Sequence, residues 1–158
     1  MALRIRPVAY GDVGACALLV LAGSLTPEAE RPDQVDAYWS AVQETRARLG
    51  DVLVAEFEGE VVGICQVMVF PHFQHTGSWC CELESVHVRA DLRSRGIGSA
   101  LLGAAEALAR QRGCYRLQLT SRNVREDAHR FYRANGWDQT SQGFKKLLAE
   151  GGAGPGGP

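Results

Sequence analysis

The sequence lacks a long hydrophobic run and a recognisable secretory signal. Its longest strongly apolar run, residues 15–22 of 158, falls short of the roughly 20 residues that cross a bilayer. Arg4, Arg6 and Pro7 precede any apolar stretch, which is unlike a secretory signal. We therefore expect a cytoplasmic protein without a membrane partner.

The sequence also lacks an excess of charge of either sign. It has 17 lysines and arginines and 18 aspartates and glutamates, for a net charge of -1. A broad basic field would be needed to neutralise nucleic-acid phosphates, so we expect no nucleic-acid partner. The 46% hydrophobic and 22% charged residues are typical of one compact domain with an ordinary core.

Cysteine is present in an odd number and without a Cys-x-x-Cys pair. The five cysteines are Cys16, Cys65, Cys80, Cys81 and Cys114. Most lie in apolar segments, which favours buried free thiols over a disulfide framework or a zinc site. We expect no bound metal.

Hydrophobic periodicity predicts an α/β (α+β) protein. Asp12 is expected to cap a helix that ends near residue 25. Further helices are expected at residues 33–49, 98–111 and 127–135. Alternation predicts strands at residues 3–6, 51–57, 61–70, 79–88, 115–120 and 144–148. The second and third strands form a hairpin, residues 1–150 form a single domain, and the Gly/Pro/Ala tail at 151–158 is disordered.

The segment from residue 86 to residue 102 has the pattern of an anion-binding loop. A strand ends near Val88, a loop carries Arg93 and Arg95, and Gly96 and Gly98 lead into a helix. The first helical turn leaves backbone N–H groups unpaired at the positive end of the helix dipole. Glycines let the backbone approach a phosphate closely. The pattern indicates a phosphate-bearing ligand, with a plain helix entry as the alternative.

Two common phosphate motifs do not fit this segment. The third glycine of a dinucleotide fingerprint is replaced by Leu101, and the Gly-Lys-Ser/Thr of a Walker loop is absent. The Arg-x-x-Gly-x-Gly pattern that begins at Arg93 instead resembles the pyrophosphate loop of the GCN5-related N-acetyltransferase (GNAT) superfamily, which binds acetyl-coenzyme A (acetyl-CoA).

Other segments extend the resemblance over residues 3–148. Glu82 stands eleven residues before Arg93, and Ala128-x-x-x-Tyr132 precedes Gly136 and Trp137, as in that superfamily. The resemblance implies the GNAT fold, a mixed, mostly antiparallel sheet of about six or seven strands with a splayed central strand pair and about four helices. Segments 72–84 and 123–132 look like those of aminoalkylphosphonate N-acetyltransferases.

The resemblance also implies the site residues. The coenzyme would be bound by Val86, His87, Val88, Arg93, Ser94, Arg95, Gly96, Ile97, Gly98, Ser99 and Asn123. Many relatives have an asparagine seven residues before the motif tyrosine, but Arg125 stands there and Asn123 lies nine before it. The turn is therefore two residues longer here. Val86 and Val88 also read as ordinary core strand residues.

Two candidate catalytic residues follow. Glu82 is the candidate base and Tyr132 the candidate acid, while Glu84 shares a strand face with Glu82 and is a second base or an ammonium anchor. Solvated strand acids and a packed aromatic are the alternatives. The loop histidines His72 and His75, with Trp79, are candidates for lining the substrate, against a metal pair or solvated histidines.

We expect an enzyme that transfers acetyl from acetyl-CoA to a primary amine of a small molecule, such as an aminoalkylphosphonate-like amine, by direct attack in a ternary complex. One alternative is acetylation of a protein lysine or N-terminus. Another is a non-catalytic acyl-CoA sensor. Relatives are frequently dimers, so a homodimer is a further expectation of the resemblance.

Overall fold

The computed structural model describes residues 2–149 and Gly154. The chain falls into two compact units, Met1–Leu119 and Thr120–Pro158, and each is described by itself. The disordered tail expected at residues 151–158 lies outside the described residues, Gly154 excepted.

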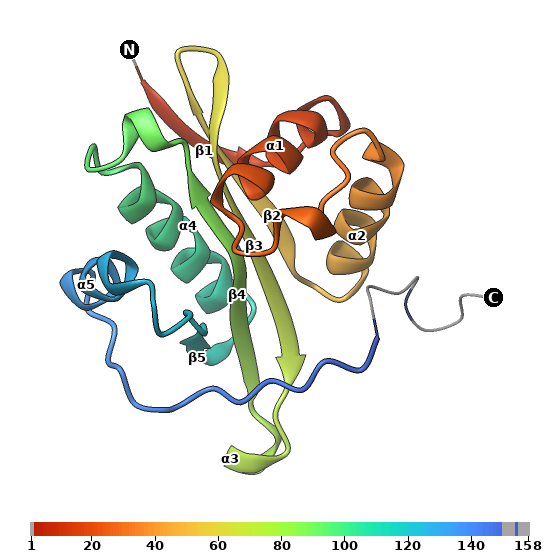
Figure 1. Cartoon of the computed structure of the whole chain (residues 1–158). Coiled ribbons are helices and arrows are strands. Elements are labelled where there is room, and N and C mark those ends of the chain that lie inside the picture. The colour runs from red at the N-terminus through yellow and green to blue at the C-terminus, as the bar shows by residue number, and fades with distance from the viewer. Residues whose placement is uncertain (1, 150–153, 155–158) are drawn as a thin grey trace. The chain divides into compact units, whose positions relative to one another are not determined.

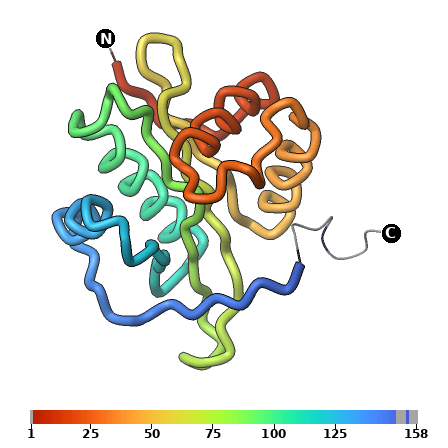
Figure 2. The backbone as a smooth tube through the Cα atoms, viewed as in Figure 1, coloured from red at the N-terminus to blue at the C-terminus, as the bar shows by residue number. Residues whose placement is uncertain are grey.

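The first unit is built on one mixed sheet (Figures 1 and 2). Its strands follow one another in chain order: β1 (Leu3–Pro7), β2 (Asp51–Phe57), β3 (Glu60–Pro71), β4 (Trp79–Val88) and β5 (Cys114–Gln118). The pairs from β1 to β4 are antiparallel, and β4 pairs with β5 in parallel. The sheet is mixed and mostly antiparallel, as the resemblance implies, but it has five strands rather than six or seven within the described residues.

Helices cover both faces of this sheet, and Figure 1 shows α1 and α2 on one side and α4 on the other. The helices of the unit are α1 (Val13–Gly23), α2 (Val35–Ala47), the short α3 (Gln74–Gly77) and α4 (Ile97–Gln111). Short 3₁₀ turns occupy Tyr10–Asp12, Pro27–Ala29 and Ala90–Leu92. The segment at residues 71–78, expected to be a loop, contains α3, in which His75 and Thr76 have positive φ.

Alternation along β3 divides the core between the two faces. Ile64 packs in a buried cluster with Cys16 of α1 and Val42 of α2. Gly63, its neighbour, faces α4 so closely that a Cβ there would lie 3.0 Å from Leu101. All five cysteines are free thiols, as expected, and burial raises the pKa of Cys16 to about 12.

The β2–β3 hairpin forms as the sequence predicts. Glu58 and Gly59 both have positive φ, which is the backbone of the tight turn that matches the twist of two antiparallel strands. Glycine adopts this conformation without strain, so the turn fixes the register of the hairpin.

Asp12 does not act as the expected helix cap. It immediately precedes α1, but its carboxylate accepts no capping hydrogen bond from the first turn of that helix. It accepts instead from the Ala9 backbone N–H at 2.8 Å and from Arg6 Nη1 at 2.6 Å. The guanidinium of Arg6 is the stronger partner because it carries a full charge.

The α2 helix ends earlier than expected, at Ala47 rather than at residue 49. Leu49 takes the left-handed conformation with φ 69°, and the Gly50 N–H bonds back to Thr45 O at 3.0 Å. That bond closes the helix end in a Schellman-type arrangement. Gly50 is needed because a Cβ there would collide with the carbonyl oxygen of Val67.

The prediction of a sixth strand at residues 144–148 is wrong. In the second unit the described residues contain α5 (Glu126–Ala134) but no strand, so the sheet has five strands within the described part of the chain. Phe144, Leu147 and Leu148 are 93%, 83% and 90% exposed. The sequence Phe-Lys-Lys-Leu-Leu does not alternate, so a strand would have no consistent apolar face to bury.

Among the described residues, no helix is both long and apolar enough to span a membrane.

Candidate active site

The candidate site is centred on the point where β4 and β5 stop pairing. The last paired residues of this parallel ladder are Glu82 and Gln118, whereas β4 continues to Val88. Beyond Glu82, the edge of β4 that carries Val86 and Val88 therefore has no strand partner among the described residues. An edge without a strand partner can pair with an extended ligand through its backbone N–H and C=O groups.

Glu82 and Glu84 lie on the same face of β4, as their spacing predicts. Glu82 is opposite Met68 and Glu84 is opposite Gln66, on the face that α1 and α2 cover. Glu82 is half-buried and its Oε2 accepts a hydrogen bond from Gln118 Nε2 at 3.1 Å, while Glu84 is exposed. The Gln118 amide thus holds the Glu82 carboxylate at the fork between the strands. Sequence analysis missed Gln118, whose only signal was a polar side chain in an alternating strand.

A bulge in β4 lies between these carboxylates and Val86. Ser85 has φ 52°, and the register between β3 and β4 shifts between Ile64 and Gln66. The extra residue turns the strand, which is a common device beside active sites. His87 returns to the α1 face, where a Cβ on Gly23 would collide with its imidazole ring. The His87 side chain therefore packs against the end of α1, which leaves its backbone as the part at the strand edge.

The loop from Arg89 to the start of α4 carries unpaired cations. Arg89 is neutralised by Glu60 at 2.9 Å and by Asp91 at 2.7 Å. Arg93 and Arg95 are exposed, and neither forms an ion pair with any described residue. Their guanidinium groups remain available to an anion.

The backbone of this loop is shaped to present N–H groups. Ser94 has φ 63° and Gly96 has φ 80°, so left-handed residues alternate with extended or helical ones directly before α4. Such alternation makes a concave nest of N–H groups that binds anions. Buried Ile97 anchors the first turn of the helix, and the N–H groups of Ile97, Gly98 and Ser99 have no partners within the helix. The predicted phosphate-binding residues thus lie in one continuous segment.

His72 and His75 lie together at the far end of the sheet, in the connection between β3 and β4. His72 Nδ1 is 2.8 Å from the Tyr115 hydroxyl, and the His75 ring centroid is 4.5 Å from that of Tyr115. Trp79, which starts β4, is 39% exposed and pairs with Cys114 of β5. Tyr115 was not singled out from the sequence. The described residues contain no cluster of three or more His, Cys, Asp or Glu side chains suited to a metal ion.

Asn123 and Tyr132 belong to the second unit. Asn123 is exposed in the turn before α5, and Tyr132 lies half-buried on that helix. The Tyr132 ring is 5.3 Å from Phe131 and 6.0 Å from Trp137, and its carbonyl accepts from the Trp137 N–H at 3.1 Å. These contacts fix the direction of the ring within the unit.

An open strand edge beside a helix N-terminus with free arginines is suited to an extended ligand with a phosphate group at one end. The sequence profile of the Acetyltransferase (GNAT) family matches residues 19–137, which includes this whole arrangement. The chain belongs to the GNAT acetyltransferase family. Members of this family are N-acetyltransferases that use acetyl-CoA, so this GNAT protein is an enzyme of that class.

Individual relatives agree with this assignment. The aminoalkylphosphonate N-acetyltransferase of Salmonella typhimurium is 39% identical over 90 residues, which are 57% of this chain and 58% of that enzyme. That match therefore spans less than two thirds of either protein. The aminoglycoside N(6')-acetyltransferase type 1 of Stenotrophomonas maltophilia is 30% identical over 87% of this chain and 88% of its own length.

Among solved structures, a protein described as a transcriptional regulator from Bacillus halodurans superposes with a TM-score of 0.85 at 31% identity. The superposition covers 93% of this chain and all of that one, so the GNAT fold extends over nearly the whole sequence.

Proposed function

We propose that this GNAT enzyme transfers the acetyl group of acetyl-CoA to a primary amine of a small molecule, by direct attack within a ternary complex. The observation that carries the proposal is the edge of β4 beyond Glu82, which has no strand partner among the described residues and runs from a half-buried carboxylate toward the loop that carries Arg93 and Arg95. The edge would pair with the pantetheine arm through the backbone at Val86, His87 and Val88. The diphosphate would lie at Arg93, Ser94, Arg95, Gly96, Ile97, Gly98 and Ser99.

Glu82 is the proposed general base. An alkyl ammonium with a pKa near 10.4 is neutral in only about one part in a few thousand at pH 7. A positioned base contributes roughly 100-fold to 10,000-fold, which offsets that fraction. The hydrogen bond from Gln118 holds the Glu82 carboxylate in place, and Glu84 on the same face would attract the cationic acceptor.

The remaining steps concern the thioester. As the amine adds to the carbonyl carbon, the thioester oxygen gains negative charge, and the backbone N–H of Val86 would donate a hydrogen bond to it. The departing thiolate then needs a proton, and Tyr132 is the proposed donor. Asn123 would contact the coenzyme arm from the turn before α5.

A small-molecule acceptor is supported by the acceptors named for the relatives, which are an aminoalkylphosphonate and an aminoglycoside. Acetylation of a protein lysine or N-terminus is the second candidate. A non-catalytic acyl-CoA sensor would have no use for both Glu82 and Tyr132.

Release of free thiol from acetyl-CoA, measured against a panel of amines and lysine peptides, tests the proposal. We expect turnover with at least one small amine. Arg93→Ala should raise the Michaelis constant for acetyl-CoA at least tenfold through loss of a phosphate contact. Tyr132→Phe should lower turnover and leave the coenzyme dissociation constant within twofold.

Thiol release with peptides alone would contradict the small-molecule acceptor and support a protein lysine or N-terminus as the acceptor. Coenzyme binding by calorimetry without thiol release from any acceptor would favour the sensor.

A further inference from the structure

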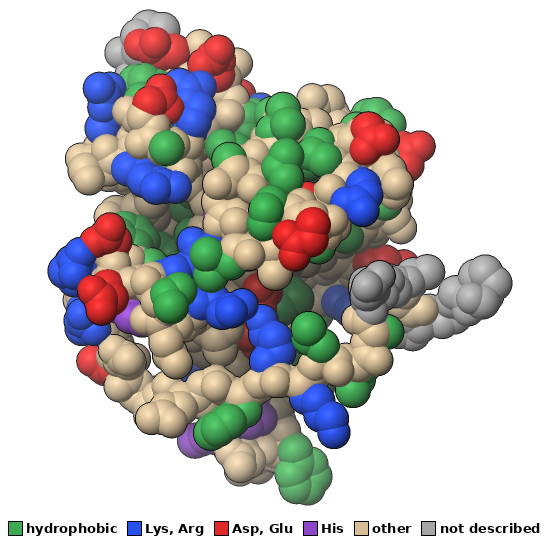
Figure 3. Space-filling model, viewed as in Figure 1, with side chains coloured by type: hydrophobic (Ala, Val, Ile, Leu, Met, Phe, Trp, Pro, Cys, Tyr) green, Lys and Arg blue, Asp and Glu red, His purple; other side chains and the backbone are tan. Residues whose placement is uncertain are grey.

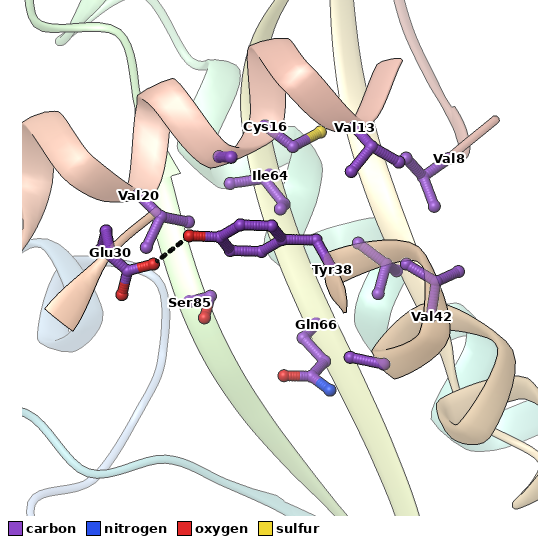
Figure 4. A pocket seen from close by; sticks show the side chains of 13 residues that line it. Val8, Val13, Cys16, Val20, Glu30, Tyr38, Val42, Ile64, Gln66 and Ser85 are labelled. Atoms are coloured by element: carbon purple, nitrogen blue, oxygen red, sulfur yellow. Dashed lines mark hydrogen bonds between the residues drawn. The ribbon is translucent and has the colours of Figure 1, made fainter. Parts of the chain in front are cut away.

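A cavity of about 180 Å³ lies between α1, α2 and the sheet, and nothing in the proposed coenzyme site uses it. Its lining is largely apolar, with Val13 and Cys16 from α1, Val42 from α2 and Ile64 from β3 (Figure 4). A cavity of about 150 Å³ holds a benzene molecule, so this one is large enough for a chain or ring of about six to eight heavy atoms.

The cavity lies on the same face of the sheet as the candidate base. Its floor includes Gln66, which is opposite Glu84, and Ser85, the residue of the bulge. Ser85 lies beyond Glu82 along β4, where the ladder to β5 has ended. A ligand in the cavity can therefore project one end toward the carboxylates and the open strand edge.

The charge in the lining of the cavity is negative. Glu30 is the only charged side chain that lines the cavity, and no Lys, Arg or His within the described residues forms an ion pair with it. The other polar side chains are those of Tyr38, Gln66 and Ser85. Burying a phosphonate or carboxylate beside Glu30 would therefore be costly, because no cationic side chain lines the cavity and the guanidinium of the neighbouring Arg31 is bound to the backbone carbonyls of Glu28 and Glu30.

Hydrogen bonds hold Glu30 and Gln66 in place. The Tyr38 hydroxyl donates to Glu30 Oε2 at 2.7 Å and accepts from the Arg31 backbone N–H at 2.9 Å, so the ring spans the cavity in Figure 4. Burial, together with Glu30, raises the pKa of Tyr38, which keeps the hydroxyl protonated as a donor. Gln66 Nε2 donates to Thr45 Oγ1 at 3.0 Å, and its carbonyl oxygen lies on the Ser85 side in Figure 4.

We propose that this cavity binds the body of the acceptor, and that Glu30 selects a compact diamine whose second ammonium group pairs with its carboxylate. The proposal rests on the proposed acetyltransferase function and narrows its acceptor class. The apolar walls take the alkyl spacer, Glu30 takes the ammonium group that is not acetylated, and the other amine points past Gln66 and Ser85 toward Glu84 and Glu82. The Glu30 carboxylate disfavours an aminoalkylphosphonate, because the phosphonate group is also negatively charged.

The test compares three acceptors in the thiol-release assay: diaminohexane, hexylamine and aminoethylphosphonate. Diaminohexane and hexylamine share an apolar body and differ in the second charge. We expect kcat/KM to be at least tenfold higher for diaminohexane than for hexylamine, and lower for aminoethylphosphonate than for either. Preferred use of aminoethylphosphonate would overturn the proposal.

Glu30→Gln keeps the shape of the side chain and removes its charge. We expect it to raise KM for diaminohexane about tenfold, with kcat changed by less than threefold, and to leave hexylamine within twofold. Tyr38→Phe, which releases Glu30 from its donor, should have a smaller effect in the same direction. Glu28→Gln is the matched control, because Glu28 is an exposed neighbour that does not line the cavity, and it should leave all three acceptors unchanged. If the ratio of kcat/KM for diaminohexane to kcat/KM for hexylamine is unchanged in Glu30→Gln, Glu30 does not select the diamine.

Calorimetric titration of diaminohexane into the coenzyme A complex measures binding to the cavity in the absence of turnover. Binding that weakens about tenfold in Glu30→Gln, but not in Glu28→Gln, supports the cavity even if no acceptor is acetylated. In that case the acetyltransferase proposal fails while the binding site stands. Binding that is absent, or equal in the wild type and Glu30→Gln, overturns the inference.

Discussion

At the scale of single residues, the Glu82 carboxylate is the group on which the proposed chemistry depends most. Glu82→Gln keeps the hydrogen-bonding partner of Gln118 nearby but removes the proton acceptor. We expect kcat to fall about 100-fold or more at pH 7, with the coenzyme dissociation constant unchanged. The deficit should shrink as the pH approaches the pKa of the acceptor amine, because the free amine then needs no base.

Steady-state kinetics from pH 6 to pH 10 measure this dependence. Glu58→Gln, at the exposed hairpin turn, is the control and should keep the wild-type profile. A Glu82→Gln variant with wild-type kcat at pH 7 would transfer the base to Glu84 or to solvent.

Asp12 gives a second residue-scale prediction, about stability rather than catalysis. The hydrogen bond from the Arg6 guanidinium lowers the pKa of Asp12 below its usual value in the folded state. A carboxyl with a depressed folded pKa stabilises the fold above its unfolded pKa of about 3.9, and this contribution is lost as the pH falls through the folded value. Asp12→Asn should therefore lower the free energy of unfolding by about 1–2 kcal/mol at pH 7.

The difference between Asp12→Asn and the wild type should shrink as the pH falls through the lowered pKa of Asp12 and disappear once the wild-type carboxyl is also protonated. Urea denaturation at pH 7 and at the acid end of the folded range measures it. Asp33→Asn, an exposed aspartate outside this pair, should differ from the wild type by no more than about 0.5 kcal/mol at either pH. A pH-independent penalty in Asp12→Asn would show that the ion pair is not its cause.

At the scale of elements, the start of α4 joins stability to ligand binding. Gly96 has φ 80° at the N-cap, a conformation that costs a residue with a Cβ about 1 kcal/mol. Gly96→Ala should lower the free energy of unfolding by about that amount and raise the Michaelis constant for acetyl-CoA several-fold, because the N–H groups of the loop are displaced.

The same helix contains its own control. A Cβ at Gly103 would meet no atom within 4 Å, and alanine is about 1 kcal/mol better than glycine inside a helix. Gly103→Ala should therefore increase stability by about 0.5–1 kcal/mol and leave coenzyme kinetics unchanged. Chemical denaturation and steady-state kinetics of the two variants decide the matter, and equal behaviour of both would remove the special role of Gly96.

Elements whose signal is local could be predicted from the sequence. The β2–β3 hairpin follows from alternation and the Glu58-Gly59 turn, and α4 follows from its apolar stripe and the glycines at its start. The strand prediction for residues 144–148 is wrong because these hydrophobic residues do not alternate, so a strand there would have no apolar face to bury. The predicted end of α2 is two residues too late because Leu49, and not a glycine, takes the left-handed conformation.

Contacts between distant elements could not be predicted in this way. Gln118 meets Glu82 only because β5 returns parallel to β4, and Tyr38 meets Glu30 only because α2 folds back over the preceding loop. The candidate base and the phosphate loop are found from short spacings, whereas the wall of the acceptor cavity depends on the packing of α1 and α2 on the sheet.

At the scale of the whole molecule, the charges are balanced and spread out. Figure 3 shows positive and negative side chains interspersed over the visible face, in keeping with a net charge of -1. The molecule as a whole therefore has no strong field to attract an anionic coenzyme, and we expect the attraction to come from local groups such as Arg93 and Arg95. Local attraction of exposed charges is screened by salt over about 10 Å at 0.1 M.

Coenzyme binding should raise the stability of the folded protein by mass action. At a free coenzyme A concentration 100 times its dissociation constant, the gain is about 2.7 kcal/mol. For a chain of 158 residues this corresponds to a rise in Tm of about 5–10 °C. Differential scanning fluorimetry measures it, and the shift should fall as salt is raised. Arg93→Ala at the same coenzyme concentration should lose about half of the shift or more, because binding that is tenfold weaker leaves a gain of about 1.4 kcal/mol. Arg110→Ala at the other end of α4 should retain the shift, because Arg110 pairs with Glu106 far along the helix from the loop. A Tm that is insensitive to coenzyme A would contradict the phosphate-binding role of the loop, since a ligand held by the folded state alone must stabilise it.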